Sequence, residues 1–422
     1  MSRLHVGLPR GAFNQQEVAL YLLAFFMQLG MGIMAPVLPE IKETFGVSTA
    51  EVALTISAFN FARVVLDLPM GLFLDRFRPF VLLLIGTSII AAGGVLGSVA
   101  PTFALIIGAR ALLGAGSAIC MMTGQYSLSK FTTRNNRGRL FGNWGASLLA
   151  GSSLSPVIGG VIAALVGWRA SFAFTACAAF LAFASVAITQ RRASSLPSET
   201  AKAKQDAPKV QRPVTRQSLV AFVLMDLVTF TFFFQISGFQ NTVAPLIGGV
   251  VLGLDAAFIG LAFTFATGLR FGVAVVGGRI SDRYGRLFVL VPGLVVMGFG
   301  ILAFNYVNSP LTYVAVLMLM ASGRTGNSVP TTVLVDHLPA RLWGRAMGIN
   351  RFIGDLGGLI GPLALGWIID SRGYADSVLV TACLVWATGL MVVLFVREAP
   401  RARPVAQPEA DRDPAVPGTA SR

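Results

Sequence analysis

Long apolar stretches alternate with short polar ones over most of the chain. Each of these stretches has about 20 residues or more, the length that an α-helix needs to cross a bilayer. Several contain Gly or Pro, which membrane helices tolerate better than soluble helices. The pattern predicts an all-α membrane protein with twelve transmembrane helices, at residues 18–38, 51–74, 80–100, 103–127, 139–165, 170–190, 217–247, 255–279, 287–307, 310–334, 344–369 and 375–396.

The composition agrees with this interpretation. Hydrophobic residues make up 55% of the 422-residue chain and charged residues only 12%, about half the charged share of a soluble domain. The formal net charge of +14 is spread between apolar stretches instead of clustering on one folded surface, which argues against a nucleic-acid partner. The three cysteines lie inside apolar stretches with no CxxC pair, so we expect neither a disulfide framework nor a metal.

Lysine and arginine set the expected orientation. If the N-terminus is cytoplasmic, 25 of the 33 basic residues fall on the cytoplasmic side and five fall within helices. The opposite loops then hold only Lys42, Arg169 and Arg372. Cytoplasmic loops of membrane proteins are enriched in basic residues, so both termini are predicted to be cytoplasmic. Short loops and the lack of an N-x-[ST] sequence suit a bacterial inner membrane.

Changes in polarity divide the chain into five segments. We predict a cytoplasmic tail (1–17), a six-helix bundle (18–190), a cytoplasmic linker (191–216), a second six-helix bundle (217–396) and a disordered tail (397–422). The linker is polar, basic and contains proline, as flexible linkers do. Its basic residues are also suited to contact anionic lipid headgroups.

The two predicted bundles repeat one another in sequence. The stretch FARVVLDLPMGLFLDRFRPF in the first bundle returns as LRFGVAVVGGRISDRYGRLF in the second. An offset of 206 or 207 residues aligns Arg63 with Arg270, Gly71 with Gly278, Asp75 with Asp282, Arg76 with Arg283, and Arg139 with Arg345. Two six-helix halves around a central site near the middle of the membrane are the architecture of many secondary transporters.

The motifs resemble those of the major facilitator superfamily. The segment Gly278-Arg279-Ile280-Ser281-Asp282-Arg283-Tyr284-Gly285-Arg286 is similar to that family's G-x-x-x-D-R-x-G-R loop motif. The copy in the first half, from Gly71 to Arg76, departs from the motif because Arg78 and Pro79 replace its later Gly and basic residue. The family's helix 4 motif is matched by Arg110, Gly114 and Gly116, and its exporter-associated helix 5 motif by Gly151, Pro156, Gly159 and Gly160.

This resemblance covers all but the tails and the linker. It implies a transporter that is not an enzyme, closest to the twelve-helix drug:proton antiporter branch. Ser155 stands where the helix 5 motif expects Gly, which weakens the exporter assignment but not the family assignment.

The repeated loop predicts a gate. A carboxylate is stabilised near the positive N-terminus of a helix, and such a contact can exist in one conformational state and break in another. We expect Asp75 to reach the start of the helix near Arg345, and Asp282 the start of the helix near Arg139. The gating residues would be Gly71, Asp75, Arg76, Gly278, Asp282, Arg283, Arg139 and Arg345. The alternative is a topology anchor with no switching role.

Eight charged residues lie within the predicted helices. They are Arg63, Asp67, Arg110, Asp226, Arg270, Arg324, Arg351 and Asp355. A charge at the bilayer centre costs at least about 2.5 to 3.5 kcal/mol, so these residues are expected in the bundle interior. The spacing of four in Arg63/Asp67 and in Arg351/Asp355 places each pair on one helix face, which favours local structural ion pairs over direct substrate contact.

The charge balance within the membrane leaves the substrate class open. Five arginines against three aspartates leave a surplus charge of +2. This surplus either favours an anionic solute, or the arginines keep nearby carboxylates ready to bind and release protons. Asp226 and Asp355 are the candidate proton carriers, with a buried, Arg-satisfied aspartate as the structural alternative. Uncharged polar candidates for the cavity are Gln28, Gln235, Gln240, Asn241 and Asn327. Phe230 and Phe232–Phe234 are expected to pack, although they could stack on a ring.

These inferences predict a monomeric secondary transporter that moves a small organic solute by alternating access, most simply by proton-coupled efflux. A proton-coupled symporter importing an organic anion is the alternative. A non-transporting membrane sensor or scaffold is the alternative of another class, but it would not need eight intramembrane charges. There is no ATP-binding G-x-x-x-x-G-K-[ST] motif, and neither a cofactor nor enzymatic activity is predicted.

Overall fold

A computed structural model describes residues 15–132, 136–193, 215–326, 329–339 and 342–396. Every regular element in these residues is a helix. The first half contains α1 (Gln15–Met31), α2 (Met34–Phe45), α3 (Thr49–Arg76), α4 (Pro79–Val99), α5 (Phe103–Lys130), α6 (Arg137–Val166) and α7 (Trp168–Ala193). The second half contains α8 (Arg216–Phe234), the π-helical segment η1 (Gln235–Val243), α9 (Ala244–Leu246), η2 (Ile247–Val251), α10 (Ala256–Tyr284), α11 (Leu287–Leu302), η3 (Ala303–Tyr306), α12 (Pro310–Ser322), η4 (Gly323–Gly326), α13 (Val329–His337), α14 (Trp343–Arg372) and α15 (Tyr374–Phe395).

Eleven helices in the described residues are long and apolar enough to cross a membrane. The predicted stretch 310–334 is not among them, because its described helical residues stop at Gly326 and resume at Val329. The segment α12 ends at Ser322, and Arg324 has non-helical backbone angles (φ −87°, ψ 26°) within η4. Glycines on both sides of Arg324 favour the break, since Gly is a poor helix former. The all-α prediction is confirmed, and this span is an interrupted helix instead of a continuous one.

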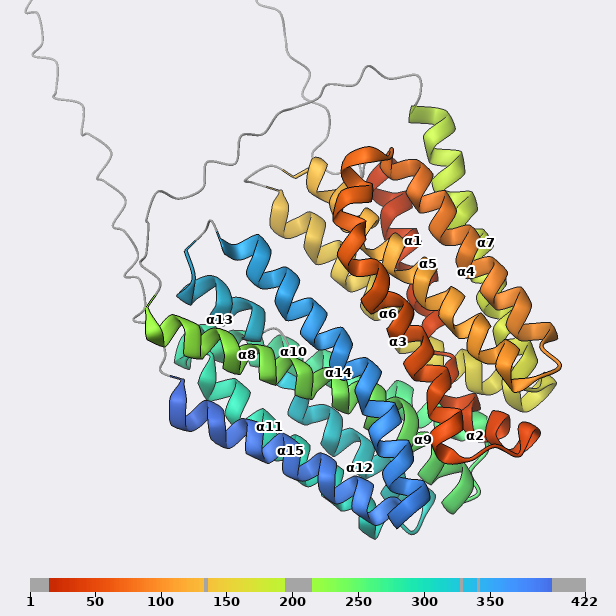
Figure 1. Cartoon of the computed structure of the whole chain (residues 1–422), viewed down its shortest axis with the longest axis vertical. Coiled ribbons are helices and arrows are strands. Elements are labelled where there is room, and N and C mark those ends of the chain that lie inside the picture. The colour runs from red at the N-terminus through yellow and green to blue at the C-terminus, as the bar shows by residue number, and fades with distance from the viewer. Residues whose placement is uncertain (1–14, 133–135, 194–214, 327–328, 340–341, 397–422) are drawn as a thin grey trace, which may run out of the picture.

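The helices form two groups, each with its own hydrophobic core. One core is built from residues of α1 to α7, together with Leu246 and Ala256. The other is built from residues of α8 to α15, together with Ala35. Figure 1 shows the first group in red to yellow and the second in green to blue, with α3 and α14 side by side between them. The predicted tails and linker lie mostly outside the described residues.

The two halves touch at one end of the helices and separate at the other. A Cβ added at Gly160 in α6 would lie 2.9 Å from the carbonyl carbon of Ala256 in α10. A Cβ at Gly366 in α14 would lie 2.9 Å from Cα of Ala50 in α3. We call this end, where α3 and α10 begin, the closed side.

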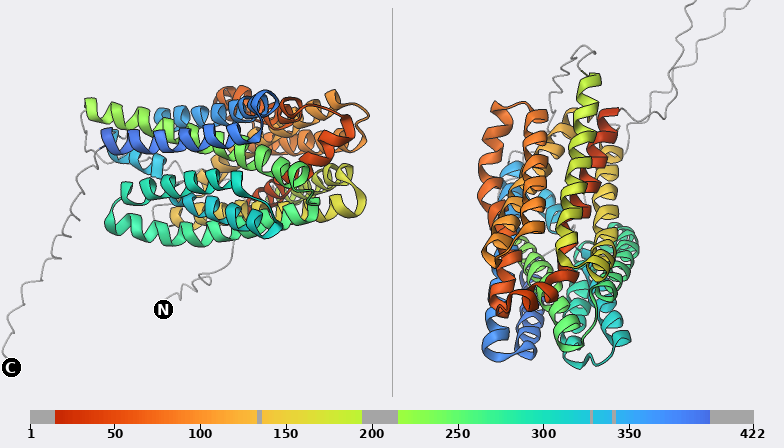
Figure 2. Two further views of the ribbon diagram at one scale, coloured as in Figure 1. Left: turned by 90° about the horizontal axis from the view of Figure 1, so that it is seen from below. Right: turned by 90° about the vertical axis from the view of Figure 1, so that its right-hand side faces the viewer.

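At the opposite end of the same helices, glycines of the two halves have no close neighbour from another helix. A Cβ added at Gly142 in α6, Gly272 in α10 or Gly348 in α14 would meet no atom within 4 Å. We call this end, where α6 and α14 begin, the open side. Figure 1 shows the same divergence of the two groups, and Figure 2 shows them from two further directions. The structure is therefore one asymmetric state, sealed at one end.

The sequence repeat extends to the backbone. Gly167 ends α6 with φ +97° and its counterpart Gly373 ends α14 with φ +93°, a region that favours glycine because other residues carry a Cβ. The loop motif behaves differently in the two halves. Gly285 adopts φ +119° after α10, whereas Arg78 at the matching position has φ −66° and leads directly into Pro79. The departure from the motif thus changes the turn.

Close helix packing around glycine yields a first prediction. Gly94 in α4 faces α7, and a Cβ there would lie 2.7 Å from the backbone nitrogen of Ala176. Gly94→Ala should destabilise the protein by about 1 to 3 kcal/mol because overpacking forces the helices apart. Gly108→Ala in α5 is the control, since its Cβ would meet nothing within 4 Å. Thermal unfolding of both variants in detergent tests this; equal unfolding temperatures would contradict it.

Candidate functional site

A ladder of polar contacts joins α3 to α14 across the two halves. Starting near the closed side, the hydroxyl of Ser57 donates to the carbonyl of Leu359 at 2.9 Å. One turn further, the side-chain amide of Asn60 donates to the carbonyl of Gly358 at 3.0 Å. Ser57 and Asn60 are buried, so these bonds satisfy polar groups that would be costly to leave unpaired in an apolar interior.

The ladder ends in a network of four charged residues. A guanidinium nitrogen of Arg63 lies 3.2 Å from a carboxylate oxygen of Asp355. Nε of Arg351 lies 3.1 Å from Asp67 and 3.9 Å from Asp355. Two positive and two negative charges, contributed by both halves, therefore share one site. Asp355 lies roughly 18 Å from the start of α14, at a rise of 1.5 Å per residue. Asp355 is fully buried.

This arrangement corrects the predicted local pairing. The spacing of four residues predicts that Arg63 pairs with Asp67, but the carboxylate partner of Arg63 is Asp355, on a helix of the other half. Only Arg351 and Asp355 approach one another along one helix. Spacing identifies a shared helix face but not the neighbouring helix, and the close approach of α3 to α14 brings the second half's residues nearer.

Asp370 seals the closed side. Its two carboxylate oxygens accept hydrogen bonds from the backbone N–H groups of Thr49 (2.9 Å) and Ala50 (2.7 Å), at the first turn of α3. These N–H groups have no partner within their own helix, and the helix N-terminus attracts negative charge. A residue near the end of α14 therefore caps a helix of the other half.

Asp226 is held near the network by Asn350. The side-chain amide of Asn350 donates to Asp226 at 2.7 Å and to the hydroxyl of Thr229 at 2.9 Å. Asp226 and Asn350 are buried, and Asn350 directly precedes Arg351. Asp226 has no arginine partner among the contacts of the described residues. The structural alternative predicted an arginine beside a buried Asp226, but its hydrogen-bond partner is the amide of Asn350.

A second, different cluster lies in the second half. Arg324 is 2% exposed, and its guanidinium donates to the side-chain oxygen of Gln240 in η1 at 2.6 Å. Arg270 lies on α10, which packs against η4: a Cβ added at Gly277 would lie 3.2 Å from the Cβ of Thr325, the residue after Arg324. Within the described residues, neither arginine has an ion pair with a carboxylate, and Nε of Arg324 has no hydrogen-bond partner.

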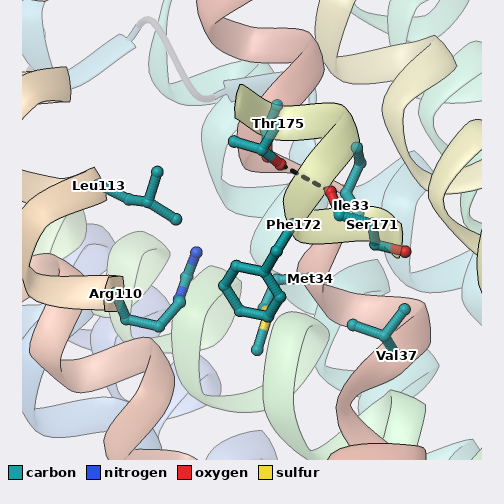
Figure 3. Close-up of a pocket in the computed structure, with 9 residues that line it drawn as sticks. Ile33, Met34, Val37, Arg110, Leu113, Ser171, Phe172 and Thr175 are labelled. Atoms are coloured by element: carbon teal, nitrogen blue, oxygen red, sulfur yellow. Dashed lines mark hydrogen bonds between the residues drawn. The ribbon is translucent and has the colours of Figure 1, made fainter. Parts of the chain in front are cut away.

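Arg110 lies apart from both clusters, within the first half. Its Nε donates to the carbonyl of Thr55 at 3.0 Å, and its guanidinium lies 4.8 Å from the centre of the Phe59 ring. It lines a small cavity of about 10 Å³, enough for about one water molecule. Figure 3 shows Arg110 extending beside Phe172 in this cavity.

The predicted gating residues lie on the open side. Arg139 is paired with Glu17 at 3.3 Å, while Arg76, Gly278 and Arg345 are exposed. Arg283 stacks on the ring of Tyr284, 5.5 Å from its centre. The surroundings of Gly71 and the side chains of Asp75 and Asp282 lie outside what the structure describes, so the predicted latch stays a prediction.

The uncharged polar candidates are dispersed. Gln235 is fully buried and its amide nitrogen lies 3.1 Å from the sulfur of Met320. The side-chain oxygens of Gln28 and Gln235 are buried without a hydrogen-bond partner. Asn241 is half-buried in η1, and Asn327 lies outside the described residues.

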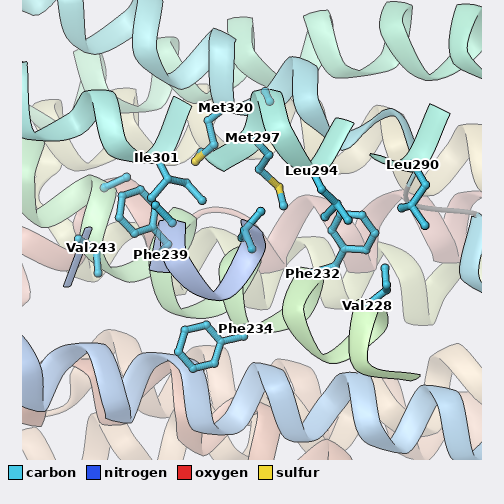
Figure 4. Packing of buried hydrophobic residues seen from close by; sticks show 14 of the residues in the cluster. Val228, Phe232, Phe234, Phe239, Val243, Leu290, Leu294, Met297, Ile301 and Met320 are labelled. Atoms are coloured by element: carbon cyan, nitrogen blue, oxygen red, sulfur yellow. The ribbon is translucent and has the colours of Figure 1, made fainter. Parts of the chain in front are cut away.

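The phenylalanines of α8 pack as expected. Phe232 and Phe234 are almost fully buried in the core of the second half. Figure 4 shows Phe232 next to Leu294, and Phe234 on the other side of α8. Phe230 packs on Phe234 with 6.0 Å between ring centres. These rings therefore pack against protein side chains, as the sequence predicts.

Sequence reasoning missed three residues of the interface between the halves, Ser57, Asn60 and Asp370, and also Asn350, which binds Asp226 within the second half. Three are uncharged polar residues inside apolar stretches, where a count of charges passes over them. Asp370 lies just after the predicted stretch 344–369, although α14 includes it. No group of three or more His, Cys, Asp or Glu that could hold a metal occurs among the described residues.

The fold and the motifs agree with comparisons to known proteins. The Major Facilitator Superfamily model matches residues 20–244 and 234–420, so the chain belongs to that family. Its members are transporters, not enzymes, and the long apolar helices make this chain an integral membrane protein.

Relatives match almost the whole chain at low identity. An uncharacterized MFS-type transporter of Methanocaldococcus jannaschii is 22% identical, covering 92% of this chain and 99% of its own length. The quinolone resistance protein NorA of Staphylococcus aureus is 23% identical, with coverage of 91% and 97%. The multidrug efflux pump LfrA of Mycolicibacterium smegmatis is 27% identical, with coverage of 84% and 81%.

Solved structures share the fold. A D-xylose-proton symporter has a TM-score of 0.74 and 14% identity, covering 91% of this chain and 98% of its own. A POT family transporter in complex with 5-aminolevulinic acid has a TM-score of 0.77 and 12% identity, with coverage of 92% and 98%. These likenesses confirm the predicted two-bundle architecture.

The charge network yields a second prediction. Arg63→Gln leaves the buried Asp355 with only the longer contact to Arg351, and breaking a buried pair costs about 3 to 5 kcal/mol. The double variant Arg63→Gln/Asp355→Asn removes both charges and should recover most of that loss. Thermal unfolding of the wild type and both variants measures the difference. If the double variant were less stable than Arg63→Gln, the two residues would not be acting as a pair.

The cap on α3 yields a third prediction. Asp370→Asn removes the negative charge and one acceptor oxygen, so the closed side should open more often. The closed state should lose about 1 kcal/mol relative to the open state, which raises the ratio of open to closed molecules about fivefold. Spin labels at Glu43→Cys and Leu311→Cys, both exposed and on opposite halves, report this opening as a longer distance. Cys120, Cys177 and Cys383 are replaced by Ala in all proteins.

Asp376→Asn, near the start of α15, is the matched control for the loss of one carboxylate. An unchanged distance distribution in Asp370→Asn would refute the role of this cap.

Proposed function

We propose that this chain is a proton-coupled exporter of a small organic solute that works by alternating access. The observation that supports this most directly is the network of Arg63, Asp67, Arg351 and Asp355, because it bridges two halves that must move relative to one another. A charge network at a moving interface can link a change of protonation to a change of conformation.

The network is balanced only while both carboxylates are ionised. A proton on Asp355 or Asp67 removes one negative charge and leaves the two arginines with a surplus of +1. Repulsion then replaces part of the attraction between α3 and α14, which favours a different relative position of the halves. The two acids approach the same nitrogen of Arg351, so their protonation belongs to the pair.

Asp226 is proposed as a second proton carrier. Its hydrogen bond to Asn350 connects it to the residue that precedes Arg351. Asn350 therefore joins Asp226 of α8 to the segment of α14 that carries Arg351 and Asp355.

Two gates at opposite ends complete the proposed cycle. Asp370 holds the closed side in the state described here. In the opposite state, Asp75 would reach the start of α14 near Arg345 and Asp282 the start of α6 near Arg139, as the repeated loop motif predicts. The same physical contact, a carboxylate at a helix N-terminus, would then close each side in turn.

The names of the relatives support export. Two of the matched proteins are called a quinolone resistance protein and a multidrug efflux pump, and a third, from Bacillus subtilis, is called multidrug resistance protein 1. We infer that this chain also moves small organic compounds, with protons as the coupling ion. The distribution of basic residues supports cytoplasmic termini and a cytoplasmic open side, and the short loops and the lack of an N-x-[ST] sequence support a bacterial inner membrane. We further propose that it acts as a monomer.

Import of an organic anion with protons is the second candidate. The observation that favours it is the pair Arg270 and Arg324, whose charges have no carboxylate partner in the described residues. The two candidates differ in the direction of solute movement relative to protons.

Transport in inside-out membrane vesicles with an acidified lumen tests the proposed function. With a fluorescent quinolone as the probe, the wild type should accumulate the probe as protons leave, whereas a symporter would not. Asp355→Asn and Asp226→Asn should each slow this accumulation about tenfold or more, a barrier increase of about 1.4 kcal/mol.

Glu43→Gln, an exposed carboxylate away from the network, is the control and should transport as the wild type does. If both aspartate variants kept full pH-driven accumulation, proton coupling through these residues would be wrong.

A further inference from the structure

The internal repeat places Arg63 and Arg270 at equivalent positions, but their surroundings differ in charge. Arg63 has Asp67 one turn further along its own helix, and Asp355 at 3.2 Å from the other half. At the positions that correspond to Asp67 and Asp355, the chain has Ala274 and Leu149. The arginine is repeated in the second half, and both acids are missing.

Arg324 adds a second positive charge at the same depth. Both arginines lie 14 residues from the start of their spans on the closed side, at Ala256 and Pro310. That is roughly 21 Å at 1.5 Å per residue, close to the middle of the membrane. Arg324 is buried and Arg270 half-buried. Uncompensated charge at this depth is unfavourable, so a ligand that neutralises it gains affinity.

Unsatisfied polar atoms occur on Arg324 and on the segment η1 that contacts it through Gln240. Its own Nε is buried without a partner, as is the side-chain oxygen of Gln235. The oxygen of Gln240 accepts from Arg324 at 2.6 Å, which fixes the direction of the guanidinium. Gln235 and Gln240 belong to η1, a π-helical segment, and such segments occur frequently at functional sites.

We propose that Arg270 and Arg324 bind the anionic group, most simply a carboxylate, of the transported solute, with Gln240 as the positioning residue for Arg324. The solute's carboxylate takes the place that Asp355 occupies beside Arg63. A guanidinium binds a carboxylate through two parallel hydrogen bonds and keeps its charge in any environment. The proposal rests on the transport activity proposed above, but not on its direction or on proton coupling.

Binding to the purified full chain without any ion gradient tests the proposal. The probes are 1-naphthoate, 1-naphthamide and 1-naphthylmethylamine, which share one ring system and differ in charge. The wild type should bind the anion at least about tenfold more tightly than the amide, and should bind the cation most weakly. Arg324→Gln and Arg270→Gln should each reduce this preference to within about twofold.

Two further variants separate binding from folding. Ala274→Asp leaves both arginines in place and adds a negative charge at the position equivalent to Asp67, so it should weaken the preference for the anion. Arg216→Gln removes an exposed arginine of the same half and should leave the preference intact. In the absence of probe, Arg324→Gln should unfold at the same or a higher temperature than the wild type, because it removes an uncompensated buried charge.

A preference for the amide or the cation in the wild type would overturn the proposal. So would an anion preference that survives in both arginine variants, or a lower unfolding temperature of Arg324→Gln with the preference intact, which would make Arg324 structural. Failure of proton-driven transport with intact naphthoate binding would refute the proposed coupling alone, because this assay uses no gradient.

Discussion

The contact between α3 and α14 is the constraint on which the rest of this structure depends. Within a bilayer the two halves gain little from burying apolar side chains against one another, because lipid tails are equally apolar. Close glycine packing and polar bonds must hold them together instead. Along α3 these bonds run from the cap by Asp370, through Ser57 and Asn60, to the four-charge network. Past that network the halves separate.

The two interfaces between the halves are built differently. The α3–α14 interface is polar and ends in paired charges, whereas the α6–α10 interface closes on glycines, with Gly160 against Ala256 and Gly260 against Pro156. An interface of small residues slides without breaking specific bonds, and a charged interface responds to protons. The pseudo-symmetric fold therefore holds an asymmetric distribution of charge, with neutral pairs around Arg63 and a positive surplus around Arg270.

Much of the fold could be predicted from the sequence. The twelve spans, the two halves and the family follow from apolar length, the repeat and the loop motif, because a bilayer fixes helix length and satisfies no backbone groups. The candidate site was predicted less completely. Charged residues inside apolar stretches are conspicuous, so Arg63, Asp226 and Asp355 were found, whereas Asn60 and Asn350 look like ordinary polar interruptions. The break at Arg324 was missed because apolar residues continue on both sides of it.

The sequence by itself determined which residues must avoid lipid and which helices carry them. Only the tertiary structure decided their partners. Spacing along a helix gives Asp67 as the neighbour of Arg63, but the crossing of α3 and α14 brings Asp355 to 3.2 Å instead. The same applies to Asp370, whose position near a helix end says nothing of the helix start it caps. Pairing across helices depends on the geometry of packing, and that geometry is not local in the chain.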